Sequence, residues 1–140
     1  MELINYARGD GLIEVANYNT PEQTVLSGEA KAIKNAIKKA KKWGAKKALL
    51  LPVSAPFHCS LLKPAGEMLK QDLEKIDFDD PKIPLINNVD AKIITKKEQI
   101  IPSLVRQVSN SVLWQDSVEL MIDEGVRTFI EIGPGTVLSN

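Results

Sequence analysis

Residues 13–28 read IEVANYNTPEQTVLSG, and this stretch constrains the fold more than any other part of the sequence. Its middle, residues 19–22, combines asparagine, threonine and proline, which favour a reversal of the chain. β-Branched and apolar residues stand on both sides of that turn, as is typical of strands. We therefore predict a β-hairpin, with one strand near residues 13–17 and its return near 24–26.

A helix is predicted directly after the hairpin, over residues 29–43. Ile33, Ala36 and Ile37 recur there with helical spacing, and Gly44 follows at a position that suits a helix end. Eight lysines and no acidic residue lie between Lys31 and Lys47. These lysines are typical of a solvated helix face, although a patch of one sign would also attract an acidic partner.

The remaining sequence alternates between strand and helix patterns, which indicates a mixed α/β or α+β fold. Strands are predicted at 47–51, 83–86 and 128–132. Helices are predicted from about 61 to 73, and over 101–108 and 113–124. A glycine turn at 133–135 follows the last strand, and residues 2–7 read as the tail of a further helix.

Composition narrows the class of protein. The 18 basic residues balance the 18 acidic ones, so net charge gives no argument for binding nucleic acid or a membrane surface. No apolar run approaches the ~20 residues that cross a bilayer, and the first residues do not resemble a secretion signal. With one cysteine, Cys59, no intramolecular disulfide can form. We expect a cytoplasmic protein.

His58, the single histidine, is the main candidate for a catalytic group. It lies in a loop after a predicted strand, and histidine is the usual general base near neutral pH. A lone histidine is more often structural than catalytic, however. Cys59 beside it points in another direction and is expected to be a small buried residue. One His and one Cys are too few ligands for zinc, so we predict no metal site.

Other catalytic patterns are incomplete in this sequence. The glycines at 133 and 135 lack the third glycine of a dinucleotide site and favour a tight turn instead. A Gly-x-Ser-x-Gly elbow, which exposes a nucleophilic serine, does not occur. The residues alone therefore give no full catalytic set.

Several segments, taken in order, resemble one family. They are VANYNTPEQTVLSG at 15–28, LPVSAPFH at 51–58, PLINNVD at 84–90, LVRQ at 104–107 with Trp114 beyond it, and EIGPGTVL at 131–138. Together they are similar to the C-terminal part of malonyl-CoA:acyl carrier protein transacylases. The half of that family that carries the serine elbow has no counterpart here.

The resemblance implies malonyl transfer from malonyl-CoA to the phosphopantetheine thiol of an acidic acyl carrier protein, through an acyl-serine intermediate, in fatty acid biosynthesis. His58 matches the family's catalytic base, and the main-chain carbonyl of Gln107 matches the group that orients it. Phe57 matches a position linked to the choice of malonyl over methylmalonyl units. Lys46 and Lys47 are expected to dock the carrier. No cofactor is implied, because the CoA thioester is a substrate.

The family fold implies an incomplete ferredoxin-like small subdomain over residues 1–52. Residues 53–140 would then be the C-terminal portion of an α/β-hydrolase-like large subdomain. The nucleophilic serine and the arginine that binds the malonyl carboxylate belong to the missing N-terminal half. We therefore predict that this chain is inactive alone and leaves apolar faces uncovered.

Two other interpretations remain open. The chain could be a non-catalytic acyltransferase remnant that binds a carrier protein. It could also be an unrelated ferredoxin-like ligand-binding domain, which would explain the hairpin and the lysine-rich helix but not the loop that contains His58.

Overall fold

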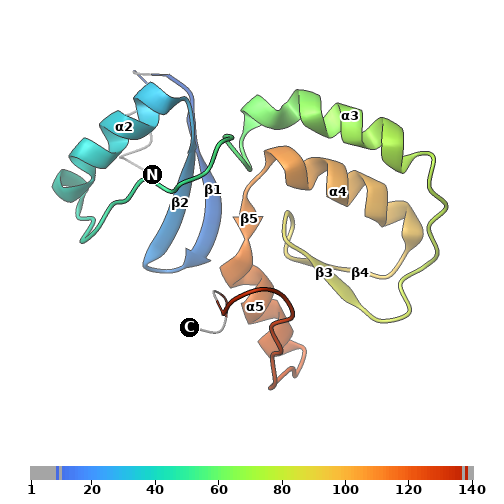
Figure 1. Ribbon diagram of the computed structural model, residues 1–140. Helices are drawn as coiled ribbons and strands as arrows, with labels where there is room; N and C mark the ends of the chain where they lie inside the picture. Colours follow the sequence, from blue (N-terminus) through green and yellow to red (C-terminus); the bar gives the residue numbers. More distant parts are fainter. Residues whose placement is uncertain (1–8, 10, 137, 139–140) are drawn as a thin grey trace.

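The elements form two groups joined by a short central strand, as Figure 1 shows. A computed structural model describes residues 9, 11–136 and 138. One group contains strands β1 and β2 with helix α2, and the other contains helices α3 and α4 with the hairpin β3–β4. The predicted helix tail at residues 2–7 lies outside the described residues.

The first group is built on the predicted hairpin, which is confirmed. Strand β1 (Ile13–Thr20) pairs antiparallel with β2 (Gln23–Gly28), from Ile13 opposite Gly28 to Thr20 opposite Gln23. Strand β5 (Val112–Leu113) then pairs in parallel with the other edge of β1, which gives the order β2-β1-β5. This third strand was not predicted, because two residues are too short to show a periodic pattern.

Helix α2 (Ala30–Lys39) packs on the hairpin and confirms the second prediction. A 3₁₀ turn (Ala40–Trp43) extends it, and Gly44 ends it in the left-handed region with φ of 87°. The helix buries Ala32 and Ala36 against Ile13, and these three side chains form the centre of the core. Small residues on the buried helix face let the backbone approach the strands closely.

The second group pairs two helices. Helix α3 (Lys63–Leu73) follows a 3₁₀ turn (Ser60–Leu62), and α4 (Ile100–Ser109) follows another (Lys97–Gln99). They approach closely at Gly66, where an added Cβ would lie 3.2 Å from the carbonyl oxygen of Val105. Both helices were predicted.

A small hairpin and a last helix complete the fold. Strand β3 (Leu85–Asn87) pairs antiparallel with β4 (Lys92–Ile94), and α5 (Trp114–Asp123) follows β5 directly. The strand predicted at 83–86 therefore begins two residues later and ends one residue later than expected, and β4 was not predicted. The predicted helix at 113–124 is confirmed.

Two predicted strands are wrong. Residues 47–51 and 128–132 have no regular secondary structure, and their apolar side chains face solvent. Leu50 is 64% exposed, Ile130 80% and Ile132 93%. A strand needs a neighbour to satisfy its backbone groups, and none of the described strands pairs with either segment. We call residues 49–53 and 129–132 the apolar loops.

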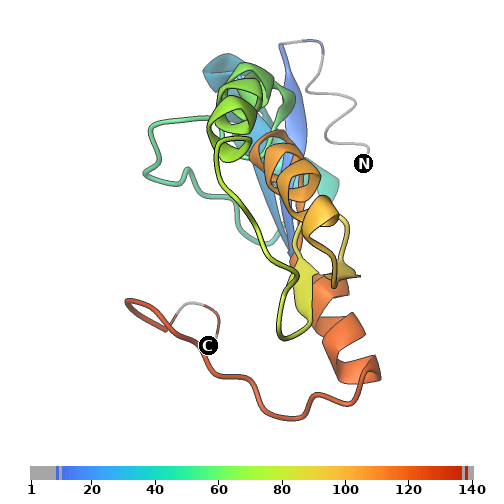
Figure 2. The ribbon, with the colours of Figure 1, turned by 90° about the vertical axis from the view of Figure 1, so that its right-hand side faces the viewer.

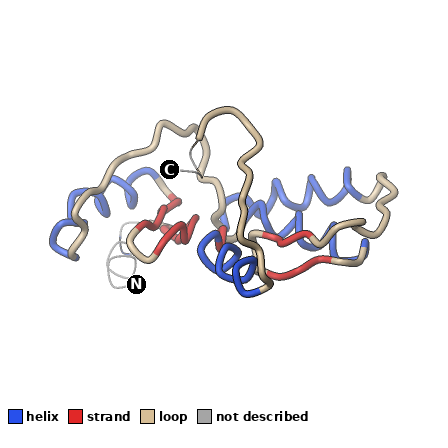
Figure 3. The backbone as a smooth tube through the Cα atoms, turned by 90° about the horizontal axis from the view of Figure 1, so that it is seen from below, coloured by secondary structure: helices blue, strands red, loops and turns tan. Residues whose placement is uncertain are grey.

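The apolar loops lie on the same side of the molecule. In Figure 2 the loop after α2 extends to the upper left and the segment after α5 runs along the bottom toward the lower left, and in Figure 3, seen from below, both lie along the upper edge. The architecture is thus a mixed α and β fold with one face occupied by exposed apolar loops. Among the described helices, none has the length and apolar character needed to span a bilayer.

Candidate active site

The loop that contains His58 has a distinctive backbone conformation. His58 has φ of 57°, in the left-handed region that non-glycine residues rarely adopt. Such a conformation costs about 1–3 kcal/mol and persists only where neighbouring contacts enforce it. Cys59 supplies one such contact, because its buried thiol donates to the Pro56 carbonyl oxygen at 3.2 Å. Cys59 is therefore a small buried residue, as predicted.

The imidazole of His58 contacts the main chain of α4. Its Nδ1 lies 3.0 Å from the carbonyl oxygen of Gln107, 49 residues along the chain, and 3.4 Å from the Gln107 side-chain nitrogen. A carbonyl oxygen can only accept, so the shorter contact assigns the proton to Nδ1. Nε2 then carries the lone pair that a general base needs.

A polar cluster fixes the middle of α4 against the β3–β4 hairpin. The Asn87 side chain donates to Asp90 and to Ser103 Oγ, each at 2.8 Å, and accepts from Lys92 N at 3.0 Å. Arg106 donates to the same carboxylate. Burial opposes ionisation of Asp90, but the hydrogen bonds from Asn87 and Arg106 outweigh it, so the pKa of Asp90 lies below its usual value. Arg106 directly precedes Gln107, so the cluster holds the turn that presents the Gln107 carbonyl.

The whole length of this arrangement matches one family. The model of the acyl transferase domain family matches residues 4–140. The chain belongs to this acyl transferase family. Its two groups of elements, with the contact between His58 and Gln107, are therefore part of an acyl transferase fold.

Relatives of this acyl transferase chain are longer. The malonyl CoA-acyl carrier protein transacylase of Bacillus subtilis is 48% identical over 128 residues, which cover 91% of this chain and 40% of the relative. The transacylase of the same name from Escherichia coli K12 is 45% identical, with coverage of 91% and 41%. The chain thus spans about two-fifths of the length of the curated relatives it matches.

Solved structures give the same result. A malonyl-transacylase solved in complex with a type II PKS acyl-carrier protein superposes with a TM-score of 0.94 at 42% identity. The transacylase from Clostridium perfringens superposes with a TM-score of 0.93 at 44% identity. The matches cover 99% of this chain, and 45% and 43% of those chains.

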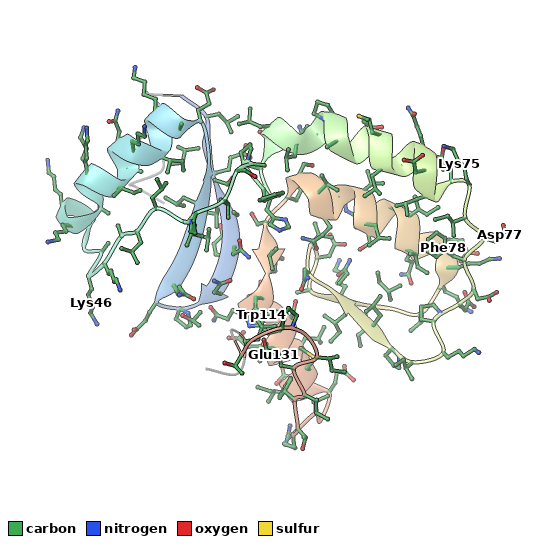
Figure 4. The ribbon with its side chains drawn as sticks, viewed as in Figure 1. Lys46, Lys75, Asp77, Phe78, Trp114 and Glu131 are labelled. Carbon is green, nitrogen blue, oxygen red and sulfur yellow. The ribbon has the colours of Figure 1, made fainter. Side chains whose placement is uncertain are left out.

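The other predicted site residues are exposed. Phe57 directly precedes His58, and its ring is half exposed. Lys46 and Lys47 follow α2, and Figure 4 shows Lys46 at the opposite end of the molecule from Lys75 and Phe78. The structure thus brings His58 and Gln107 into contact, with Phe57 beside them in the loop. It leaves the two lysines on the surface of the first group.

Several residues without a predicted role hold the loop of His58 and helix α4 in place. Glu14 and Ser60 bond to each other and so join the two groups of elements. The Asn87 side chain lies at the centre of the polar cluster. Of these residues, only Asn87 could have been singled out from the sequence, because it lies in the segment PLINNVD that resembles the family. In the part of the chain that the structure describes, no three His, Cys, Asp or Glu side chains gather as a metal site would require.

Proposed function

We propose that this chain supplies the general base of a malonyl transferase whose nucleophilic serine lies outside the present sequence. The observation that carries the proposal is the 3.0 Å contact between His58 Nδ1 and the Gln107 carbonyl oxygen. It fixes the tautomer in which Nε2 can take a proton, and a main-chain acceptor achieves this without an aspartate. The relatives named above support malonyl-CoA and an acyl carrier protein as the substrates.

The reaction has two proton-balanced steps. The serine Oγ attacks the malonyl thioester while His58 Nε2 takes the hydroxyl proton, and that proton then passes to the departing CoA sulfur. In the second step Nε2 takes the proton of the carrier's phosphopantetheine thiol as its sulfur attacks the acyl-serine ester. The proton returns to the serine oxygen, which restores the starting state.

The missing nucleophile requires a complementary polypeptide, either the preceding part of the same chain or a second chain. We assign its contact surface to the apolar loops, because exposed apolar patches mark protein interfaces. Both loops lie on one side of the molecule and carry strand-like sequences, and none of the described strands pairs with them. In this proposal residues 1–52 belong to a ferredoxin-like subdomain and residues 53–140 to a hydrolase-like one, each completed by that polypeptide.

Complementation tests the proposal. The full chain is mixed or co-expressed with the segment of the B. subtilis transacylase that it does not match, and radiolabelled malonyl transfer to holo acyl carrier protein is measured. We expect transfer only with both polypeptides, and a loss of at least ~100-fold with His58→Ala, as general base removal typically gives. Gln107→Ala is the matched control, because it keeps the main-chain carbonyl and should retain activity within about fivefold.

The alternative function, a carrier-binding module, predicts different results. The chain alone would then be monomeric, would unfold cooperatively and would bind the carrier protein. Its affinity would be the same with His58→Ala, and addition of the complementary segment would give no transfer. Full transfer by the His58→Ala complex would also contradict the proposed role of His58.

A further inference from the structure

Two consecutive residues of β1 bond to the two segments that carry His58 and Gln107. One residue bonds just after His58, and the other bonds just after the helix that contains Gln107. The Glu14 carboxylate accepts from Ser60 N at 2.7 Å and from Ser60 Oγ at 2.9 Å. Its neighbour Val15 accepts, through its carbonyl oxygen, from Ser111 Oγ at 2.6 Å. Ser60 lies just after His58, and Ser111 lies just after the helix that contains Gln107.

These bonds close a ring of contacts. Glu14 bonds to Ser60, which lies two residues after His58 in the chain, and His58 contacts the Gln107 carbonyl. From Gln107 the chain continues to Ser111, which bonds to Val15, the neighbour of Glu14. The parallel pairing of β1 with β5 reinforces the last link. One strand, β1, therefore bonds to both of the segments that set the distance between the imidazole and its acceptor.

The Glu14 side chain holds Ser60 at two points. A carboxylate that accepts both a main-chain N–H and a hydroxyl from one residue fixes that residue's backbone and side chain together. All three groups are partly buried, so water competes weakly for them. The fixed residue lies two positions from the left-handed backbone of His58, which needs such support to persist.

We infer that Glu14 is a positioning residue that acts through Ser60 to hold the His58 imidazole on the Gln107 carbonyl. This inference rests on the proposed role of His58 as the general base. Without the bonds from Ser60 to Glu14, the His58 backbone relaxes from its left-handed conformation and the ring loses its fixed acceptor. The base then populates both neutral tautomers, and only one of them can accept the serine proton at Nε2.

The tautomer can be read directly, because His58 is the single histidine of the chain. Only this chain is labelled with ¹⁵N-histidine, and ring nitrogen shifts are recorded at alkaline pH, alone and in the complex with the unlabelled complementary segment. We expect the Nδ1–H form to dominate in the wild type. Glu14→Ala should lower the ratio of Nδ1–H to Nε2–H at least ~10-fold. Glu14→Gln, whose amide can still bond to Ser60, should stay within about twofold of the wild type.

Further variants separate positioning from general loss of structure. Ser60→Ala removes the hydroxyl bond alone and should give an intermediate ratio. Glu22→Ala, at an exposed carboxylate in the hairpin turn, should change nothing. In the complemented enzyme Glu14→Ala should lower kcat by about 10- to 100-fold with little change in the KM for malonyl-CoA, as expected for a misplaced group.

The outcomes distinguish the inference from the function on which it rests. A wild-type His58 without the Nδ1–H preference would contradict the proposed function itself. A wild-type preference that survives Glu14→Ala unchanged would overturn only the role of Glu14. Equal loss in Glu14→Ala and Glu14→Gln would also overturn it, because it would mean that the bonds to Ser60 are not what matters. If Glu14→Ala fails to fold, the graded series from Ser60→Ala to Glu14→Gln decides the same question.

Discussion

Replacing Asn87 tests directly how much the polar cluster contributes to holding α4 in place. Its side chain makes three hydrogen bonds, to Asp90, Ser103 and the main chain of Lys92. A net contribution of about 1 kcal/mol for each bond gives roughly 3 kcal/mol for Asn87→Ala. Asn87 is only half-buried, and water can replace part of the bonding to Asp90 and Lys92. We therefore expect a loss of about 2 kcal/mol in the free energy of unfolding.

Urea unfolding measures this loss, with the fluorescence of Trp43 and Trp114 as the signal. Asn19→Ala is the matched control, because the Asn19 side chain makes one exposed bond, to Gln23 at 3.2 Å. The control should cost only about 0.5 kcal/mol, because it removes a single bond for which water competes. Equal urea midpoints for the two variants would refute the reasoning, since the three bonds of Asn87 would then stabilise the fold no more than the single exposed bond of Asn19 does.

Three further predictions concern charge and selectivity. The pKa of Asp90 is lowered in the folded state, so its stabilising effect is present above about pH 4 and is lost as pH falls through the folded pKa. The wild type should therefore be more stable than Asp90→Asn at neutral pH, and urea midpoints should converge in acid. Phe57→Ser should raise the use of methylmalonyl-CoA by the complemented enzyme, because a smaller side chain leaves room for the 2-methyl group. Reversing charge at Lys46 and Lys47 to Glu should weaken transfer to the carrier but spare hydrolysis of malonyl-CoA.

Each of these has a result that contradicts it. A stability difference for Asp90→Asn that persists unchanged in acid would mean that ionisation of Asp90 is not its source. Unchanged selectivity in Phe57→Ser would show that the ring only packs. For the lysines, the exposed pair Lys63 and Lys82 provides a control reversal elsewhere on the surface. Equal loss of transfer and hydrolysis, or equal loss in the control, would argue against docking.

The sequence predicted those elements whose patterns are local. Turn chemistry at residues 19–22 located the hairpin, and helical spacing with Gly44 located α2 and its end. The strands at 47–51 and 128–132 were predicted on the same kind of evidence and are wrong here. Strand propensity is mostly a measure of fit to a partly buried surface, and no strand among the described residues lies beside these segments to provide one.

The site was less predictable than the fold. The pairing of His58 with Gln107 came from the resemblance to a family, because no periodic pattern relates residues 49 positions apart. Glu14 reads in sequence as an ordinary outward residue of a strand. Its role depends on where the loop after His58 passes over β1, which is a property of tertiary structure alone.

The way in which β5 joins the sheet has a consequence for folding kinetics. Its pairing with β1 joins residues 95 positions apart, and the bond of Ser111 to Val15 joins residues 96 positions apart. Contacts so distant in sequence form slowly, because the entropy cost of closing a long loop comes before the contacts can stabilise the chain. The hairpin and α2 should thus form early, and β5 should dock late. The bonds of β1 to Ser60 and Ser111 would close only in this final step, so the support that β1 gives to the loop of His58 would be among the last features gained on folding and among the first lost on heating.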